Sequence, residues 1–212
     1  MTPTNLLPPS VPNSRNQHYY EPRNGHGLPH DPFNAIVGPR PIGWISTVSP
    51  AGVANLAPYS QWQNLTFDPP MVMFAANQYA DGRRKHTVIN AEETGWFVWN
   101  MCTYDLREAM NITAMEWPEG TDEFEKAGVT KAPCIDAPAP RVAESPAHFE
   151  CKYLSTHRLK GNSNHGWVDV VYGEVIRIHA PEVTLTRPTR LLHPRYPIYI
   201  APNPDTGLSL VP

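Results

Sequence analysis

The sequence has few cysteines, little net charge and no long apolar run. Its 212 residues include 3 cysteines, and the formal net charge is −3 at pH 7. The thiols of Cys102, Cys134 and Cys151 show no C-x-x-C spacing, which favours reduced, buried side chains over a disulfide framework. A slightly acidic chain lacks the basic surface that nucleic acids and anionic membranes attract. We therefore expect no nucleic-acid partner and no membrane partner.

Targeting signals and common ligand motifs are also missing. The first residues have no basic and apolar regions of signal-peptide type, and no apolar run approaches the ~20 residues of a membrane span. The segment Gly25-His26-Gly27 lacks the third glycine and the following helix of a dinucleotide-binding fingerprint. His157, His165 and His179 show no metal-ligand spacing, and the possible ligands His26 and His30-Asp31 lie in a Pro/Gly-rich arm, which disfavours a metal site. We expect a cytoplasmic protein with no Rossmann domain and no metal site.

Proline, by contrast, is abundant. The 25 prolines are roughly twice the average usage of about 5% and gather toward both ends of the chain. Because proline lacks the backbone N–H and fixes φ, we expect these ends to form neither helices nor central strands. The sequence thus predicts Pro-rich arms at residues 1–32 and 182–212 around one domain at 33–181.

The central segment reads mainly as strands. A hairpin is expected within residues 41–60 and further strands at 71–76, 96–101, 147–154 and 167–178. Three short helices are expected at about 87–94, after a Thr103 cap, and from Thr121 to Gly128, with a Pro-rich connection at 132–146. Many strands without β-α-β alternation favour a mainly β fold, an antiparallel barrel with a few peripheral helices.

Two segments carry candidate binding chemistry. The hairpin that contains Trp44-Ile45-Ser46-Thr47 and Asn55-Leu56-Ala57-Pro58-Tyr59-Ser60 offers hydroxyls and backbone groups, which we expect at a strand edge where a flat polar ring can dock. An ordinary barrel hairpin is the alternative interpretation. Arg83-Arg84-Lys85-His86-Thr87 places three positive charges and a capping hydroxyl before a predicted helix. Exposed N–H groups and the helix dipole make that arrangement typical of a phosphate site, although a solvated basic loop has the same composition.

These segments, taken in order, resemble the flavin reductase-like, FMN-binding split-barrel family. The resemblance covers roughly residues 38–180 and includes the hairpin, a Lys-x-Thr before the helix, Glu144-Ser145-Pro146 and Gly173-Glu174-Val175. It implies a Greek-key split barrel that binds FMN, with FAD as the alternative, near the interface of a homodimer. Family members use NADH or NADPH to reduce the flavin, and the hydride passes to flavin N5 without a protein nucleophile.

The resemblance also implies which residues form the site. The isoalloxazine and ribityl chain would meet the backbone of Trp44, Ile45, Ser46, Thr47, Asn55, Ala57, Pro58, Tyr59 and Ser60. Arg84, Lys85 and Thr87 would hold the phosphate. No catalytic side chain is required, although His165 and Asp169 would lie near the nicotinamide.

Four departures from the family pattern keep other functions open, and the unusual C-terminal arm is one of them. His86 replaces the usual Asp, Gln61-Trp62-Gln63 stands where many members carry aromatics, and Val168 replaces a His of many reductases. The first interpretation is an NAD(P)H-dependent flavin reductase that supplies a partner monooxygenase. The alternatives are an electron-transfer or flavin-storage protein without a nicotinamide site, and an oxidase of the pyridoxamine-phosphate-oxidase type.

Overall fold

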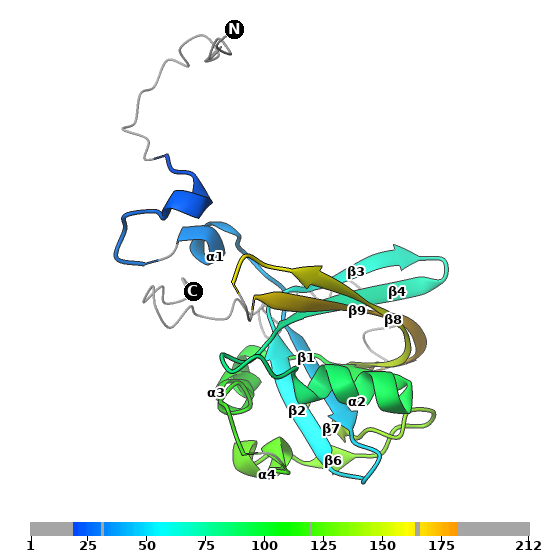
Figure 1. Cartoon of the computed structure of the whole chain (residues 1–212). Helices are drawn as coiled ribbons and strands as arrows, with labels where there is room; N and C mark the ends of the chain where they lie inside the picture. Colours follow the sequence, from blue (N-terminus) through cyan, green and yellow to red (C-terminus); the bar gives the residue numbers. More distant parts are fainter. Residues whose placement is uncertain (1–18, 31, 119, 164–165, 182–212) are drawn as a thin grey trace, which may run out of the picture. The chain divides into compact units, whose positions relative to one another are not determined.

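The computed structural model describes residues 19–30, 32–118, 120–163 and 166–181 (Figure 1). Contacts divide the chain into two compact units whose boundary lies between Val37 and Gly38. The predicted C-terminal arm at 182–212 and the predicted site residue His165 lie outside the described residues.

The first unit contains two short helices, and one of them, η1, lies within the arm at 1–32 from which the sequence interpretation excluded helices. The 3-10 helix η1 spans Pro22–Asn24 and the α-helix α1 spans Pro32–Ile36. The expectation of a helix-free arm was therefore wrong. Both helices begin at a proline, where the missing N–H costs no intrahelical bond and the fixed φ suits the first turn.

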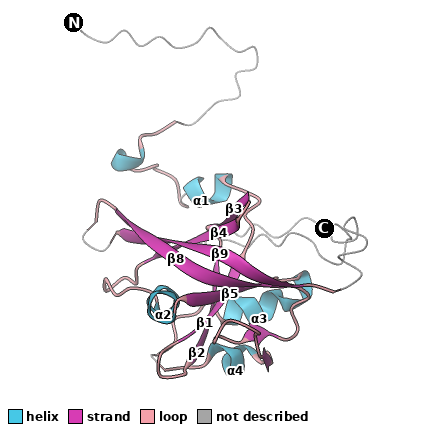
Figure 2. Cartoon of the chain, turned by 90° about the vertical axis from the view of Figure 1, so that its right-hand side faces the viewer, coloured by secondary structure: helices cyan, strands magenta, loops and turns pink. Residues whose placement is uncertain are grey.

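The second unit is built on one seven-stranded antiparallel sheet, in the order β2-β1-β5-β8-β9-β4-β3 (Figure 2). Its strands are β1 (Gly43–Val48), β2 (Ala54–Tyr59), β3 (Trp62–Phe67), β4 (Pro70–Asn77), β5 (Trp96–Asn100), β8 (His148–Lys160) and β9 (Trp167–His179). Three antiparallel hairpins, β1–β2, β3–β4 and β8–β9, account for most of the sheet. The predicted mainly antiparallel β architecture is confirmed.

The two end strands of the sheet come together because β2 runs almost directly into β3. Only Ser60 and Gln61 separate them, and the Gln61 carbonyl accepts a hydrogen bond from Ala75 N in β4 at 2.8 Å. The curled sheet encloses an aromatic core in which Phe74 lies 4.9 Å from Tyr59 and 5.3 Å from Phe97 between ring centroids. This curvature gives the barrel its interior.

Strand β3 was not predicted from the sequence. After the buried Trp62, every residue of β3 is exposed, so the strand shows no alternation of apolar and polar positions. The Trp62 indole stacks on Trp99 of β5, with ring centroids 5.6 Å apart and planes 2° from parallel. The absence of a side chain at Gly43 permits this approach, since a Cβ there would meet Trp62 Cε3 at 2.9 Å.

The peripheral helices are short, and α2 packs against the barrel core. Helix α2 (His86–Thr94) buries Val88 and Ala91 in the barrel core and ends at Gly95, whose φ of 77° is left-handed. The remaining elements are η2 (Tyr104–Leu106), α3 (Arg107–Ile112), α4 (Glu123–Ala127), β6 (Lys131–Ala132) and β7 (Arg141–Val142). In contrast to α2, helices α3 and α4 bury Met110 and Phe124 in a second apolar cluster.

Two predicted helix caps differ from the structure. The hydroxyl of Thr103 precedes η2 without bonding to it, and Asp122 rather than Thr121 caps α4, its carboxylate accepting from Phe124 N at 3.0 Å. Among the helices of the described residues, none has the length and apolar character needed to cross a membrane.

Candidate functional site

A small cavity lies where β2, the start of α2 and the connection from α3 to α4 meet. Its lining residues are Asn55, Ala57, Pro58 and Tyr59 from β2, Tyr79, Lys85, His86 and Thr87 around the start of α2, and residues 113–117 with Glu123 opposite. The structure thus brings together, from distant parts of the sequence, most of the predicted residues of β2 and the predicted Lys85 and Thr87. The cavity measures about 80 Å³, far below the roughly 300–1,000 Å³ of a complete cofactor pocket. It has room for a small group such as a phosphate.

The N-terminus of α2 lies at this cavity with its amides uncapped. Lys85 is the N-cap, in extended conformation, and among the described residues no side chain caps the helix. The first N–H groups of a helix have no intrahelical acceptor, so those at His86 and Thr87 are available to an anion. The predicted hydroxyl cap is wrong, because Thr87 Oγ1 is buried and accepts a hydrogen bond from Asn55 Nδ2 at 2.9 Å.

Lys85 is the cation of the cavity. Its Nζ lies 3.4 Å from the centroid of the Tyr79 ring and 3.8 Å from Glu116 Oε1. Burial lowers the pKa of the Lys85 ammonium, and the charge of Glu116 acts in the opposite direction. Tyr79 and Glu116 had not been predicted as site residues. No local sequence pattern marks either residue as part of a binding site, and Glu116 lies 31 positions from Lys85 along the chain.

A second carboxylate, that of Glu123, faces the cavity from the first turn of α4. Its Oε2 accepts a hydrogen bond from Leu56 N, on the outer edge of β2, at 3.1 Å. Burial raises the pKa of Glu123, and the hydrogen bond from Leu56 opposes that rise. Burial likewise raises the pKa of the Tyr59 hydroxyl, although its hydrogen bond with Thr87 lowers it. The site therefore contains one cation and two carboxylates, besides His86.

Arg84, which was predicted to hold the phosphate, is directed to two carboxylates. Its Nε donates to Asp169 Oδ2 at 2.9 Å, and its Nη1 and Nη2 donate to Glu92 at 2.8 and 2.7 Å. These hydrogen bonds, those with Glu92 first, raise the pKa of the guanidinium. Asp169 is buried and also lies 3.3 Å from Arg158 Nε, so the predicted nicotinamide neighbour is an ion-pair partner in β9. The network ties the loop before α2 to α2, β8 and β9.

The predicted residues of β1 are buried inside the sheet rather than placed at its edge. Strand β1 lies between β2 and β5, and Trp44 to Thr47 are fully buried. Trp44 Nε1 donates to Thr113 Oγ1 at 2.9 Å, and Ser46 Oγ donates to the Pro140 carbonyl at 2.6 Å. The strand-edge expectation was therefore wrong for Trp44 to Ser46, which pair with β2 on one side and β5 on the other, whereas β2 is an end strand of the sheet. Ser60, just beyond β2, is half-buried.

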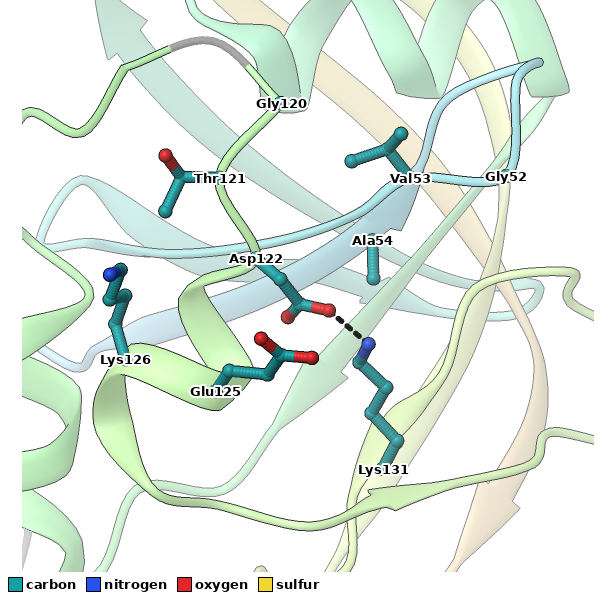
Figure 3. A pocket seen from close by; sticks show the side chains of 9 residues that line it. All are labelled: Gly52, Val53, Ala54, Gly120, Thr121, Asp122, Glu125, Lys126 and Lys131. Carbon is teal, nitrogen blue, oxygen red and sulfur yellow. Dashed lines mark hydrogen bonds and ion pairs between the residues drawn. The ribbon is translucent and has the colours of Figure 1, made fainter.

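A neighbouring hollow shares none of the predicted binding residues. It is lined by Gly52, Val53, Ala54, Gly120, Thr121, Asp122, Glu125, Lys126 and Lys131 (Figure 3). The carboxylate of Asp122 contacts the ammonium of Lys131 there and also caps α4. Because Asp122 and Lys131 already pair with each other, the α2 cavity is the stronger candidate for a ligand site. No group of three or more metal-ligating side chains occurs in the described part of the chain.

The curled antiparallel sheet with its short peripheral helices is the architecture of a split-barrel protein. The chain belongs to the flavin reductase like domain family, which matches residues 38–197. An uncharacterized protein of Aquifex aeolicus (strain VF5) is 34% identical over 164 residues, which cover 76% of this chain and 79% of the relative.

Solved structures show the same fold. Nitrilotriacetate monooxygenase component B from Bacillus cereus superposes with a TM-score of 0.67 at 28% identity, covering 84% of each chain. A structure with a split barrel domain from Shewanella frigidimarina superposes with a TM-score of 0.59 at 24% identity, covering 68% of each chain. The predicted family and its split-barrel fold are confirmed.

The residues of the α2 cavity fit the phosphate end of a flavin in part. Lys85 and the uncapped amides supply the donors that a phosphate requires. A cavity of this size holds no more than that end of the molecule. Glu116 and Glu123 oppose an anion.

Proposed function

We propose that this protein is an FMN-dependent oxidoreductase that uses NADH or NADPH, with the FMN phosphate at the start of α2. The observation that carries the proposal is the convergence of Lys85 and the uncapped N-terminus of α2 on one small cavity beside β2. Membership of the flavin reductase like family supports the redox chemistry. FAD fits the same anion site if its additional phosphate and nucleoside extend outward.

Each part of the chain has a distinct task in this proposal. Lys85 and the first amides of α2 bind and orient the phosphate through charge-assisted hydrogen bonds. The outer edge of β2 from Ala57 to Tyr59, with Ser60 just beyond it, supports the ring, while the buried hydrogen bonds of β1 keep that edge in place. Bound flavin would supply the chemistry by accepting a hydride from the nicotinamide. Arg84 would then hold the loop rather than the ligand, because carboxylates already engage its nitrogens.

We also propose a cytoplasmic homodimer that delivers reduced flavin to a separate monooxygenase component. The similarity to component B of nitrilotriacetate monooxygenase supports delivery of reduced flavin to a monooxygenase component. The exposed side chains of Leu65 and Phe67 on the edge strand β3 support the homodimer, since exposed apolar surface favours association.

The test is an anaerobic visible spectrum of the purified protein with one equivalent of FMN, before and after addition of NADH and then NADPH. We expect a perturbed flavin band that bleaches much faster than in a protein-free control. A perturbed band that neither nucleotide bleaches would contradict nicotinamide use and favour electron transfer or oxidase chemistry. A band identical to that of free FMN would contradict flavin binding altogether.

A further inference from the structure

The charges of the α2 cavity do not match a simple phosphate site. Lys85 contributes one positive charge, and Glu116 and Glu123 contribute two carboxylates. A phosphate monoester adds about −1.5 to −2 at neutral pH. With both carboxylates ionised and in place, an arriving phosphate would meet more negative than positive side-chain charge. Movement of one carboxylate away from the cavity would relieve this repulsion when a phosphate binds.

The two carboxylates differ in how firmly they are held. Glu123 is partly buried and accepts the Leu56 N–H at 3.1 Å, so its position is fixed by β2. The Glu116 side chain is 69% exposed and lies in the connection between α3 and α4. Its 3.8 Å distance to Lys85 Nζ is that of a loose ion pair, longer than a hydrogen bond. Glu116 is therefore the carboxylate that can leave.

Two neighbouring side chains restrict the position of the Lys85 ammonium. The aromatic face of Tyr79 lies 3.4 Å from the ammonium, and the Glu116 carboxylate is its ion-pair partner. A phosphate at the α2 N-terminus would compete with Glu116 for the same ammonium. The phosphate would offer more charge and more acceptor oxygens, while Glu116 has the advantage of being attached to the chain.

We propose that Glu116 is a built-in competitor for Lys85 that weakens the binding of the flavin phosphate and speeds its release. This inference rests on the proposed flavin site and adds a property to it: the flavin is exchangeable, as a released substrate or product must be. Glu116 returns to Lys85 as the phosphate leaves, so the ammonium is never without a counter-charge. The residue sets affinity and takes no part in hydride transfer.

The experiment compares Glu116→Gln with the wild-type chain in titrations with FMN and with riboflavin, which lacks the phosphate, followed by flavin fluorescence. We expect Glu116→Gln to lower the Kd for FMN by roughly three- to tenfold and to slow FMN release, because a modest charge repulsion is removed. Riboflavin affinity should stay unchanged. Glu108→Gln on α3 is the matched control, since Glu108 is exposed and pairs with Arg107.

The outcomes separate this inference from the proposed function. Unchanged or weaker FMN binding by Glu116→Gln, with wild-type binding intact, would overturn the competition and leave the flavin site standing. An equal gain for riboflavin and FMN would also overturn it, because the effect would not involve the phosphate. If neither flavin binds to any of the three proteins, the proposed function fails and this inference fails with it.

Discussion

Lys85 is the residue whose charge the candidate site uses most directly. Its ammonium faces the cavity at the start of α2, where Glu116 is its ion-pair partner. Replacing Lys85 by Ala removes a charge-assisted hydrogen bond, so we expect FMN affinity to fall by about 1–3 kcal/mol. Fluorescence titration measures the change, with Lys152→Ala on the exposed face of β8 as the control. Equal affinities of wild type and Lys85→Ala would rule out the phosphate assignment.

Two buried residues, His148 and Glu150, connect stability to pH. The Nε2 of His148 donates to the Val142 carbonyl at 2.7 Å, and burial lowers the pKa of the imidazole to about 4. Burial alone would raise the pKa of Glu150, but N–H groups of residues 135–137 and His179 Nε2 bond to its carboxylate and lower that pKa to about 2. Both groups bind fewer protons in the folded state than in the unfolded state.

The free energy of unfolding should therefore fall on acidification. For His148 the stabilisation is complete above the unfolded pKa of about 6.5 and is lost as the pH falls toward 4; for Glu150 the loss runs from about 4.5 to 2. Between pH ~7 and ~4.5 we expect His148 to account for about 2–3 kcal/mol. Urea unfolding of wild type and His148→Gln at both pH values measures the difference. The same acid dependence in both proteins would contradict this assignment.

At the scale of elements, the hairpins owe their positions to contacts between strands far apart in sequence. Trp62 of β3 packs on Trp99 of β5, and Gly43 of β1 leaves the space for the indole. Gly173 of β9 does the same for Phe97, since a Cβ there would lie 2.4 Å from Cζ of the ring. Close packing of this kind fixes which faces of the strands turn inward and so where the outer edge of β2 lies.

Substituting Gly43 by Ala tests this packing. The added Cβ would meet the rigid indole at 2.9 Å, so one of the two strands must shift. Overpacking of a core costs about 1–3 kcal/mol, and we expect a loss of that size in the free energy of unfolding. Gly38→Ala is the control, because a Cβ at Gly38 meets nothing within 4 Å. Equal unfolding midpoints for both variants would contradict this prediction, because they would show that β3 shifts without a loss in the free energy of unfolding.

At the scale of the whole molecule, the edge strand β3 bears on the proposed homodimer. Phe67 is 91% exposed at the end of β3, and Leu65 is exposed two residues earlier on the same strand. Large exposed apolar side chains on an edge strand favour association with another chain. These residues are consequently our candidates for the dimer contact.

We expect Phe67→Asp to shift the protein from dimer to monomer, because association would bury a carboxylate in an apolar contact. Light scattering coupled to size-exclusion chromatography measures the mass, and Tyr104→Asp, on the exposed surface of η2, is the control. A Phe67→Asp protein that stays dimeric would place the interface elsewhere. A wild-type protein that is monomeric would contradict the homodimer itself.

Local sequence patterns were sufficient for much of the fold. The alternation in β9, the apolar run of β4 and the Gly95 stop of α2 depend on neighbours along the chain, so their elements were predicted almost to the residue. Strand β3 was missed because all its residues after Trp62 are exposed, so the strand shows no alternation of apolar and polar positions. The family followed from short motifs in a fixed order, a property of the sequence alone.

The candidate site depended more on the tertiary structure. Sequence identified Lys85 and β2 because a basic residue before a helix and a hydroxyl-rich hairpin are local signals. It could not show that Arg84 is bound by Glu92 and Asp169, since its partner Asp169 lies 85 positions away. Nor could it show that Glu116 faces Lys85. The amino-acid sequence specifies which charged side chains the protein has. Folding decides which of them pair, because it brings distant segments within a few ångströms of one another.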